Sequence, residues 1–365
     1  MRHVALGIKR DRALAISGLT RHQYYYNPRK VRKKPGPKAS TTTACYVQGV
    51  LEVHDNEQVV KKMKDNHNDP DLRYGYKRMT TELQISGYQI NHKKVYRMMK
   101  EQSLLQEKKK GTDKKYVKYR VVIPERPLEV LEMDIKFVWI ESERRHGYIL
   151  TVLDVFTRIV LAWHVGMSIT QHTIKQMWTS VIENHLQEND TLNRGVNIEI
   201  RNDNDPRFSA KMVQKFFKEN HLDQVFTHPY TPQENGHIES FHAILSRSLN
   251  RCHFDNLGQV ESHLILFYEK YNNTRLHGSL ANLSPRGFWD QWNKGNITRT
   301  VKGKKKVKFK LTIPYYQLSG YGNQKEASCS SHDALNGQND LEKEVVDVDS
   351  LQQLSVQRSP EVASC

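Results

Sequence analysis

From Leu128 onward the chain changes its hydrophobic pattern repeatedly, and the order of these changes limits what it can fold into. Three short runs rich in Val, Ile, Leu and Trp come first, and helical periodicity then alternates with two further short runs. Runs of this kind are typical of strands, whereas helices have an apolar period near 3.6 residues. The predicted strands are 128–140, 147–154, 158–165, 196–201 and 224–227, and the predicted helices are 171–188, 209–220 and 235–251. The order βββαβαβα predicts an α/β body, a mixed sheet with helices on its faces.

An all-helical region is predicted ahead of this body. Residues 1–35 predict a short helical segment, and helical periodicity resumes from about Val47 to Met63 before the turn formers of 65–71. Two compact helices follow, from Tyr76 to Ile85 and from His92 to about Gln102, joined by a Gly-containing turn, with Asn91 as the N-cap of the second.

The second of these helices carries a basic stripe. Lys93, Arg97 and Lys100 are spaced i, i+4 and i+7, which places them on one exposed face. A helix, a Gly-containing turn and a basic second helix fit a helix-turn-helix that enters a major groove. From spacing alone, an ordinary helical hairpin with a solvated face is an equally good interpretation.

Net charge favours a polyanionic partner. The formal charge is +16, and residues 1–127 contain 29 Lys and Arg against 12 Asp and Glu. A basic half joined to a nearly neutral half indicates an arm that binds polyanions and a body with another task. No stretch approaches about 18 consecutive apolar residues, so no membrane span is predicted. The four cysteines lack CxxC spacing, which fits a reducing cytoplasm and predicts no structural zinc.

Three acidic residues stand out by their positions in the predicted body. Asp134 lies within the first strand, Asp203 follows the fourth strand, and Glu239 lies in the first turns of the last helix. Thirty-five residues separate Asp203 from Glu239. Clustered carboxylates repel one another, and two Mg²⁺ ions would relieve the repulsion while binding phosphate and nucleophile oxygens. Three nearby acids are competing candidates, each explicable as a turn cap or ion-pair partner: Asp154, Asp205 and Glu234.

Around these carboxylates the chain resembles the retroviral-integrase-like superfamily with its Asp-Asp-35-Glu pattern. More narrowly, it resembles the bacterial insertion-sequence-three family of transposases, in its downstream-frame catalytic product. The resemblance covers residues 10–292 and is carried by these runs: Arg73-Tyr74-Gly75-Tyr76-Lys77-Arg78 with Asn91-His92-Lys93-Lys94-Val95; Leu153-Asp154-Val155-Phe156-Thr157-Arg158; 200–210; 231–241; and Tyr271-Asn272-Asn273 with Arg275, His277, Leu280 and Pro285.

The resemblance implies a ribonuclease-H-like core with a five-stranded mixed sheet behind a helix-turn-helix region. It implies a polynucleotidyl transferase that cleaves and joins DNA strands, with Asp134, Asp203 and Glu239 holding two Mg²⁺ ions that Mn²⁺ is expected to replace. It further implies multimers on double-stranded DNA, an upstream-frame DNA-binding partner and a bacterial, nucleoid-associated cytoplasmic location. The residues expected to contact DNA are Lys77, Arg78, Lys93, Lys94, Arg97, Lys100 and Arg247.

The chain departs from the family pattern near two of the carboxylates. Asp205 and Arg207 stand where Gly and Gln are frequent, so an extra acid lies beside the expected metal site. Ser246 stands where a Lys is common, with Arg247 beside it as the expected substitute.

The predicted domains follow from these patterns. They are an N-terminal helical segment and linker (1–43), a helix-turn-helix domain (44–106), a basic linker (107–126), the catalytic core (127–292), a basic C-terminal segment (293–320) and a disordered acidic tail (321–365). For 301–313, a strand with one charged face and a basic linker both remain open. Two other functions remain open as well: a plain metal-dependent nuclease and a non-catalytic DNA-binding regulator of transposition.

Overall fold

The computed structural model describes residues 6–26, 40–106, 123–191, 197–227, 235–303 and 306–318. The chain divides into two compact units, Met1–Thr41 and Thr42–Cys365. The predictions for Glu234, for most of the basic linker and for the acidic tail lie outside the described residues.

The first unit contains two short helices, α2 (Arg10–Ser17) and α3 (Arg21–Tyr25). Gly18 ends α2 in the left-handed conformation, and Thr20 begins α3 with a capping box to Gln23. The predicted helical segment is therefore confirmed, as two helices and not one.

The second unit begins with a strand pair that the sequence analysis did not predict. Strands β1 (Thr42–Val47) and β2 (Val50–Asp55) pair antiparallel, and helix α4 (Asn56–Asn68) starts only after them. The prediction of a helix from Val47 is therefore wrong over its first half. The physical reason is the Gln48-Gly49 pair, whose positive φ angles form the two-residue turn that right-twisted hairpins favour.

Helices α5 (Tyr76–Ile85) and α6 (His92–Glu101) confirm the predicted helix pair. The Asn91 side chain accepts a hydrogen bond from the Lys94 amide at 2.9 Å, as expected of an N-cap. In the turn between the helices, Gly87 has a φ of +94°, and a Cβ there would meet the Tyr46 carbonyl oxygen at 2.3 Å. Only glycine fits this turn, because the β1 backbone passes directly against it.

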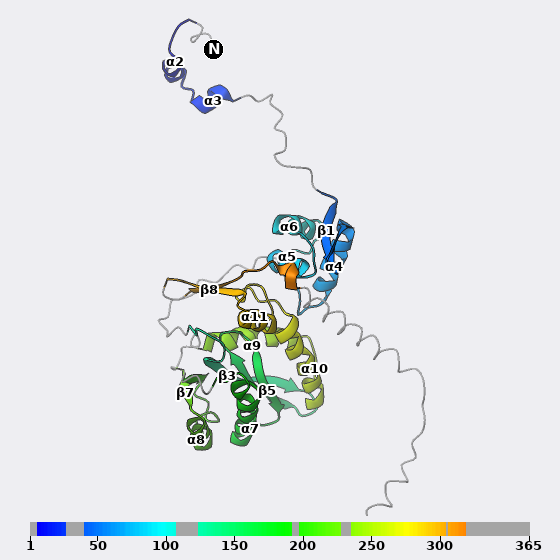
Figure 1. Ribbon diagram of the computed structural model, residues 1–365, viewed down its shortest axis with the longest axis vertical. Helices are drawn as coiled ribbons and strands as arrows, with labels where there is room; N and C mark the ends of the chain where they lie inside the picture. Colours follow the sequence, from blue (N-terminus) through cyan, green and yellow to red (C-terminus); the bar gives the residue numbers. More distant parts are fainter. Residues whose placement is uncertain are drawn as a thin grey trace, which may run out of the picture. The chain divides into compact units, whose positions relative to one another are not determined.

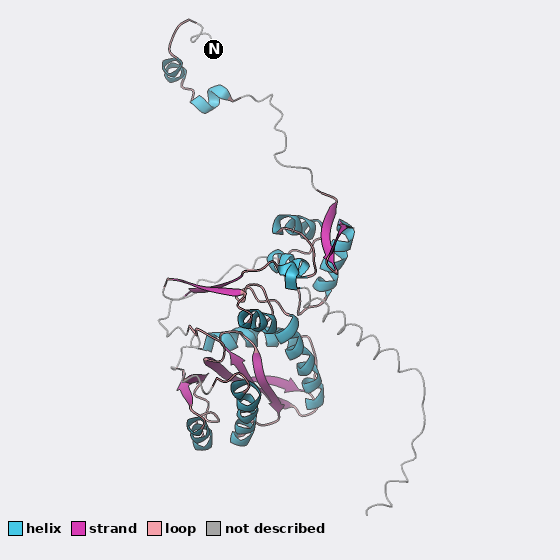
Figure 2. Ribbon diagram, viewed as in Figure 1, coloured by secondary structure: helices cyan, strands magenta, loops and turns pink. Residues whose placement is uncertain are grey.

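The body of the second unit is built on a five-stranded sheet. Its strands are β3 (Val130–Ile140), β4 (Arg145–Asp154), β5 (Val160–Gly166), β6 (Ile198–Asn202) and β7 (Leu222–Phe226), in the order β5-β4-β3-β6-β7. The first three pair antiparallel, whereas β6 runs parallel to β3 and β7 parallel to β6. The predicted mixed sheet of the ribonuclease-H-like arrangement is confirmed, and Figure 2 shows its strands enclosed by helices.

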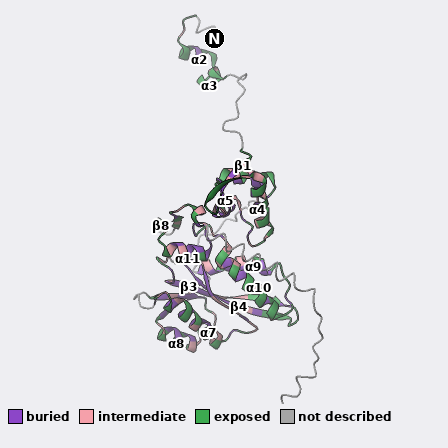
Figure 3. Cartoon of the chain, turned by 45° about the vertical axis from the view of Figure 1, so that its right-hand side comes forward, coloured by how far each residue is buried: buried purple, intermediate pink, exposed green. Residues whose placement is uncertain are grey.

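Helices cover both faces of this sheet (Figure 1). Helices α7 (Gln171–Val181), extended by a π-helical turn (Ile182–Gln187), and α8 (Lys211–Glu219) pack on one face around Trp178. Helices α9 (Gly236–Leu249) and α10 (Leu257–Glu269) pack on the other face around Phe241. Figure 3 shows the buried residues gathered along the sheet and on the inward sides of these helices.

Beyond α9 the structure adds elements that the sequence analysis did not place. Helix α10 continues into a π-helical turn (Lys270–Thr274), and α11 (Pro285–Asn293) follows. The open question about 301–313 is answered by a hairpin, β8 (Ile297–Lys302) with β9 (Lys306–Leu311). Phe309 of this hairpin packs against Phe156, Phe288 and Trp292, which anchors the hairpin to α11. None of the helices in the described part of the chain has the length and apolarity needed to cross a membrane.

Candidate active site

Asp134 lies midway along β3, the central strand of the sheet. Strand β6 pairs with β3 only through Val130, Leu131 and Glu132, so Asp134 lies two residues past the end of that pairing. Alternate residues of a strand point to opposite faces, and Asp134 points to the face covered by α9. About a quarter of its side chain (24%) remains accessible to solvent.

Asp203 follows the last residue of β6, as predicted. The neighbouring strand β7 continues its pairing up to Asn202, which fixes the point where the chain leaves the sheet. The Asp205 amide donates a hydrogen bond to Asp203 Oδ1 at 3.2 Å. This local turn holds the Asp203 carboxylate at the sheet edge next to β3.

Glu239 lies in the first turn of α9, and its backbone is held in place by a buried acid. The Ile238 amide donates to Glu132 Oε2 at 2.6 Å, which ties the start of α9 to β3 two residues before Asp134. Burial raises the pKa of Glu132 to about 7, while the Ile238 amide and two arginines act against this rise. Ile238, Phe241, Leu245 and Leu249 form the buried apolar stripe of α9, and Glu239 lies at its border.

The three predicted carboxylates influence one another electrostatically. Asp203 and Glu239 are exposed as whole residues, yet the pKa of each carboxyl group is raised. Desolvation is the largest cause for both, and the negative charge of Asp134 raises both further. Asp134 is therefore the shared neighbour of Asp203 and Glu239, which come from a loop and a helix.

His242 is a site residue to which the sequence analysis gave no role. Its Nδ1 lies 3.2 Å from Asp134 Oδ2, and its ring is almost completely buried. The signal was its position three residues after Glu239 on the same flank of the helix. Glu132 was likewise missed, although its spacing of two residues from Asp134 puts both on one face of β3.

The competing acids are explained by contacts of their own. Asp154 is fully buried and accepts hydrogen bonds from the amides of Leu128, Phe156 and Thr157 and from the Thr157 hydroxyl. Asp205 forms a two-pronged ion pair with Arg207, whose hydrogen bonds are the main reason that the pKa of Asp205 is lowered. The two departures that lie near Asp203 are therefore partners, and Arg207 neutralises the charge of Asp205.

The donor set suits a hard divalent cation in its chemistry. Carboxylate oxygens are the ligands that Mg²⁺ and Mn²⁺ prefer, and a cation would relieve the repulsion centred on Asp134. Within the described ranges, no group of three or more His, Cys, Asp or Glu side chains forms a ready-made metal cage. The residues fit the ions by charge and ligand type, and the structure shows the carboxylates as electrostatic neighbours only.

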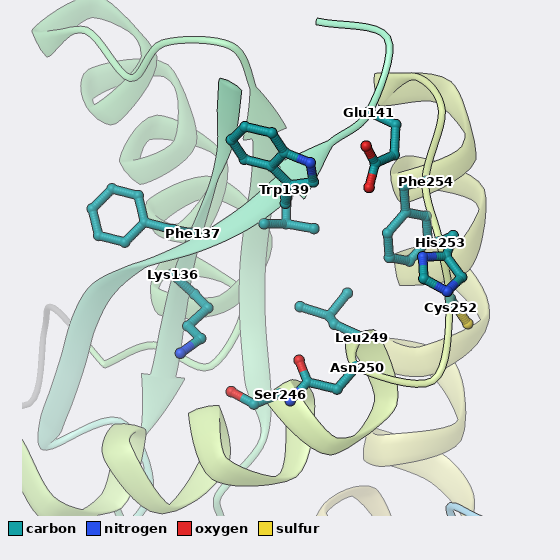
Figure 4. A pocket seen from close by; sticks show the side chains of 11 residues that line it. Lys136, Phe137, Trp139, Glu141, Ser246, Leu249, Asn250, Cys252, His253 and Phe254 are labelled. Carbon is teal, nitrogen blue, oxygen red and sulfur yellow. The ribbon is translucent and has the colours of Figure 1, made fainter. Parts of the chain in front are cut away.

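A pocket of about 300 Å³ lies between β3 and the C-terminal end of α9 (Figure 4). Lys136 enters it from β3, two residues after Asp134, and Ser246 enters it from α9, seven residues after Glu239. Arg247 is not among the residues that line this pocket, and its Nε donates to the Ala243 carbonyl of its own helix. Lys136, and not Arg247, is therefore the cation beside Ser246.

The residues predicted to contact DNA differ in their surroundings. Lys77, Lys93 and Lys100 are exposed, and Arg97 lies 3.9 Å from Glu101. The Lys94 ammonium donates to the Thr42 carbonyl and to the Thr43 hydroxyl, and Arg78 donates to the Leu276 carbonyl. Two donors of Lys94 and one donor of Arg78 are thus used within the fold.

Comparison with known proteins identifies three matching domain families. Residues 124–232 and 220–285 match two families described as integrase core domain, and residues 54–111 match an HTH-like domain. The HTH-like match contains helices α4, α5 and α6, and the integrase core matches contain the five-stranded sheet.

Individual relatives are distant in sequence. The chain is 26% identical over 218 residues to the insertion element IS476 uncharacterized 39.2 kDa protein of Xanthomonas euvesicatoria, a match that covers 59% of this chain and 60% of that protein. It is 22% identical over 251 residues to the transposase for insertion sequence element IS904 of Lactococcus lactis, with 64% and 94% covered. Among solved structures, the Mos1 transposase catalytic domain aligns at 14% identity and a TM-score of 0.35, with 46% of this chain and 78% of that chain covered.

The matched regions agree with the order of domains, the sheet topology and the motif runs described above. The sheet is that of an integrase core, and an HTH-like domain precedes it. The chain therefore contains an integrase core domain preceded by an HTH-like domain, and it is similar to proteins encoded by insertion elements.

Proposed function

We propose that this protein cleaves and joins DNA strands at the ends of an insertion sequence, with Asp134, Asp203 and Glu239 as ligands of two Mg²⁺ ions. Mn²⁺ is expected to replace Mg²⁺. The observation that carries the proposal is the charge of Asp134, which raises the pKa of both Asp203 and Glu239. Such repulsion destabilises the folded chain unless a cation offsets it, so a cation-binding role explains the arrangement.

The surrounding residues have supporting roles in this proposal. Divalent ions at these carboxylates supply polarisation of the phosphodiester and activation of water or a 3′-hydroxyl. Glu132 fixes the start of α9 so that Glu239 is presented to the site, and His242 holds Asp134 from the same helix. Arg207 keeps the Asp205 carboxylate occupied, which leaves Asp203 as the ligand.

We further propose which parts of the chain bind duplex DNA. The exposed face of α6 with Lys93, Arg97 and Lys100, together with Lys77 of α5, fits contacts to phosphates. Lys136 contributes a cation next to the reacting phosphate. Lys94 and Arg78 are left out of this set because their donors are bound within the fold.

The rest of the proposal concerns assembly. The protein acts as a multimer that holds two DNA ends together, in the cytoplasm of a bacterium at its nucleoid. It is the downstream-frame product, and an upstream-frame partner supplies recognition of the terminal repeats.

The test is a strand-transfer assay with labelled ends of the source element, in Mg²⁺ and in EDTA, comparing wild type with Glu239→Gln. Glu234 is outside the described residues, so the matched control is Glu269→Gln, a carboxylate at the end of α10. Joined products that need the metal and disappear only in Glu239→Gln support the proposal. Cleavage without joining indicates a nuclease. DNA binding without reaction, even after addition of the upstream-frame product, indicates a non-catalytic regulator.

A further inference from the structure

Four aromatic side chains form a row on the outer part of the β3–β4 hairpin. Phe137 lies opposite Tyr148 in the strand register, and Trp139 lies opposite His146. The ring centroids are 5.3 Å apart for Phe137 and Tyr148, and 5.1 Å apart for Trp139 and His146. Phe137 and His146 link the two pairs at 6.1 Å. We call these four residues the aromatic row.

The aromatic row is exposed although most of its sheet face is covered. Helices α7 and α8 bury the neighbouring part of that face, and Tyr148 is half-buried at their border. Phe137 and Trp139 remain 52% and 43% exposed. Figure 4 shows the Phe137 ring directed away from Ser246, Leu249 and Asn250, toward which Lys136 extends from the same strand. Phe137 and Trp139 also belong to the lining of the pocket that holds Lys136, so the row borders that pocket.

Contacts connect the aromatic row to the candidate active site. The Arg207 guanidinium lies over the Tyr148 ring, 5.1 Å from its centroid. The same guanidinium pairs with Asp205, whose amide donates to Asp203. Tyr148, at the inner end of the row, is thus linked to Asp203 through Arg207 and Asp205, and the row extends outward from there along the hairpin.

The chemistry of the row favours one occupant. Flat rings with an adjacent guanidinium stack on the faces of nucleobases. A duplex hides those faces within its own stack, so only unpaired nucleotides offer them. The hairpin end is exposed and carries Arg144, Arg145 and His146, which bring positive charge for the phosphates of such a strand. Arg145 lies 3.5 Å from Glu143, but this ion pair is solvent-exposed and therefore weak.

We propose that the aromatic row binds unpaired nucleotides on the sheet face opposite Asp134, as a stacking platform for a single-stranded DNA segment that extends from the Asp203 side of the candidate active site. The inference rests on the proposed function for its position in the reaction, because a single strand at this place is useful to an enzyme that opens DNA ends. It does not depend on catalysis for its test, because stacking needs no metal ion.

The experiment measures equilibrium binding of a labelled oligothymidylate, and of a duplex of equal length, to the full-length protein in EDTA. The variants are Phe137→Ala, Trp139→Ala and their combination. Trp139→Phe keeps a ring at the row and serves as the conservative variant. Leu266→Ala on α10 is the matched control, since Leu266 is an apolar residue that is 51% exposed. Circular dichroism and thermal melting verify that each variant is folded.

The expected result is a loss of single-strand affinity of roughly 5- to 150-fold for each ring that stacks on a base, with duplex affinity within about twofold of wild type. Trp139→Phe and Leu266→Ala should bind the single strand as wild type does. Unchanged single-strand affinity in the double alanine variant overturns the inference. Sedimentation that shows loss of a dimer in that variant, with single-strand affinity unchanged, assigns the surface to a second copy of the chain instead.

Failure of the proposed function gives a different pattern. A protein without strand-transfer activity in Mg²⁺ whose single-strand binding still depends on the row would refute the function and keep the inference.

Discussion

His242 Nδ1 lies 3.2 Å from Asp134 Oδ2, and the other ring nitrogen, Nε2, is buried without a hydrogen-bond partner among the described residues. This contact joins the helix that carries Glu239 to the strand that carries Asp134. The ring therefore orients one predicted metal ligand and sets its separation from another.

Replacing His242 should weaken the site without preventing DNA binding. We expect His242→Ala to lower strand transfer about 10- to 100-fold, the usual effect of removing a residue that orients a metal ligand. His242→Asn should recover part of the activity, because its amide nitrogen occupies nearly the position of Nδ1. The activity is measured as a function of Mg²⁺ concentration. Equal activity of the alanine and asparagine variants would contradict an orienting role.

Binding of metal should be visible in protein stability as well as in activity. A ligand that binds only the folded chain stabilises it by about 2.7 kcal/mol at 100 times its dissociation constant. We expect Mn²⁺ to raise the melting temperature of wild type and to have little effect on Glu239→Gln. In EDTA, Glu239→Gln should melt at or slightly above the wild-type temperature, because it removes the repulsion from Asp134. A Mn²⁺ shift of equal size in both proteins would exclude Glu239 as a ligand.

The pairing of Asp205 with Arg207 makes a prediction about double substitution. Arg207→Gln alone should reduce activity, because it leaves the Asp205 carboxylate uncompensated beside Asp203. Asp205→Gly combined with Arg207→Gln should recover activity, because both charges are then removed. Strand-transfer rates for wild type, Arg207→Gln, Asp205→Gly and the double variant give the coupling energy between the two positions. We expect this energy to be about 1 kcal/mol or more. Additive effects would mean that the pair does not protect Asp203.

Asp154 should matter for stability and not for catalysis. Asp154→Ala leaves several buried donors unsatisfied, including the amides of Leu128 and Thr157, and should cost roughly 2 to 4 kcal/mol in the free energy of unfolding. Urea denaturation measures that loss. Activity per folded molecule should stay within about threefold of wild type at low temperature. A folded but inactive Asp154 variant would make this residue a competitor of Asp134.

Asp69 and Lys270 join the segment after α4 to the end of α10, and their ion pair predicts a pH dependence. Burial acts to raise the pKa of Asp69, but hydrogen bonds from Lys270 and from the amides of Asp71 and Leu72 lower it overall. A lowered carboxyl pKa stabilises the fold fully above the ordinary value of 3.8, and this stabilisation is lost as the pH falls through the folded-state pKa.

The measurement compares urea denaturation of wild type and Lys270→Met at pH 7 and at pH 3.5 or below. We expect a destabilisation of about 1 kcal/mol at pH 7 that shrinks at the acidic pH, because the 2.8 Å pair is partly solvent-exposed. Lys215→Met is the control: Lys215 lies 3.7 Å from Glu219 in a pair with both side chains mostly exposed, and its loss should have almost no effect. A pH-independent loss in Lys270→Met would point to packing of the lysine stem.

Local patterns predicted most of the elements correctly. Helix α5 has the predicted bounds, α6 ends one residue from its predicted end, and the five strands follow in the predicted order. These elements have strong apolar periods or clear caps such as Asn91. The hairpin of β1 and β2 was missed because β2 is largely exposed and the buried alternate positions of β1 are Thr43 and Cys45, so no run of large apolar residues marks a period of two.

The sequence by itself determined the α/β order, the basic N-terminal half and the three carboxylates, because strand ends, helix starts and charge are local properties of the chain. Only the tertiary structure decided which groups become neighbours. It made Asp134 the electrostatic neighbour of Asp203 and Glu239, placed His242 against Asp134, paired Asp205 with Arg207 and put Lys136 in the pocket that Ser246 lines. Such contacts depend on strand register and helix rotation, which are set by packing across the whole sheet and not by any single segment.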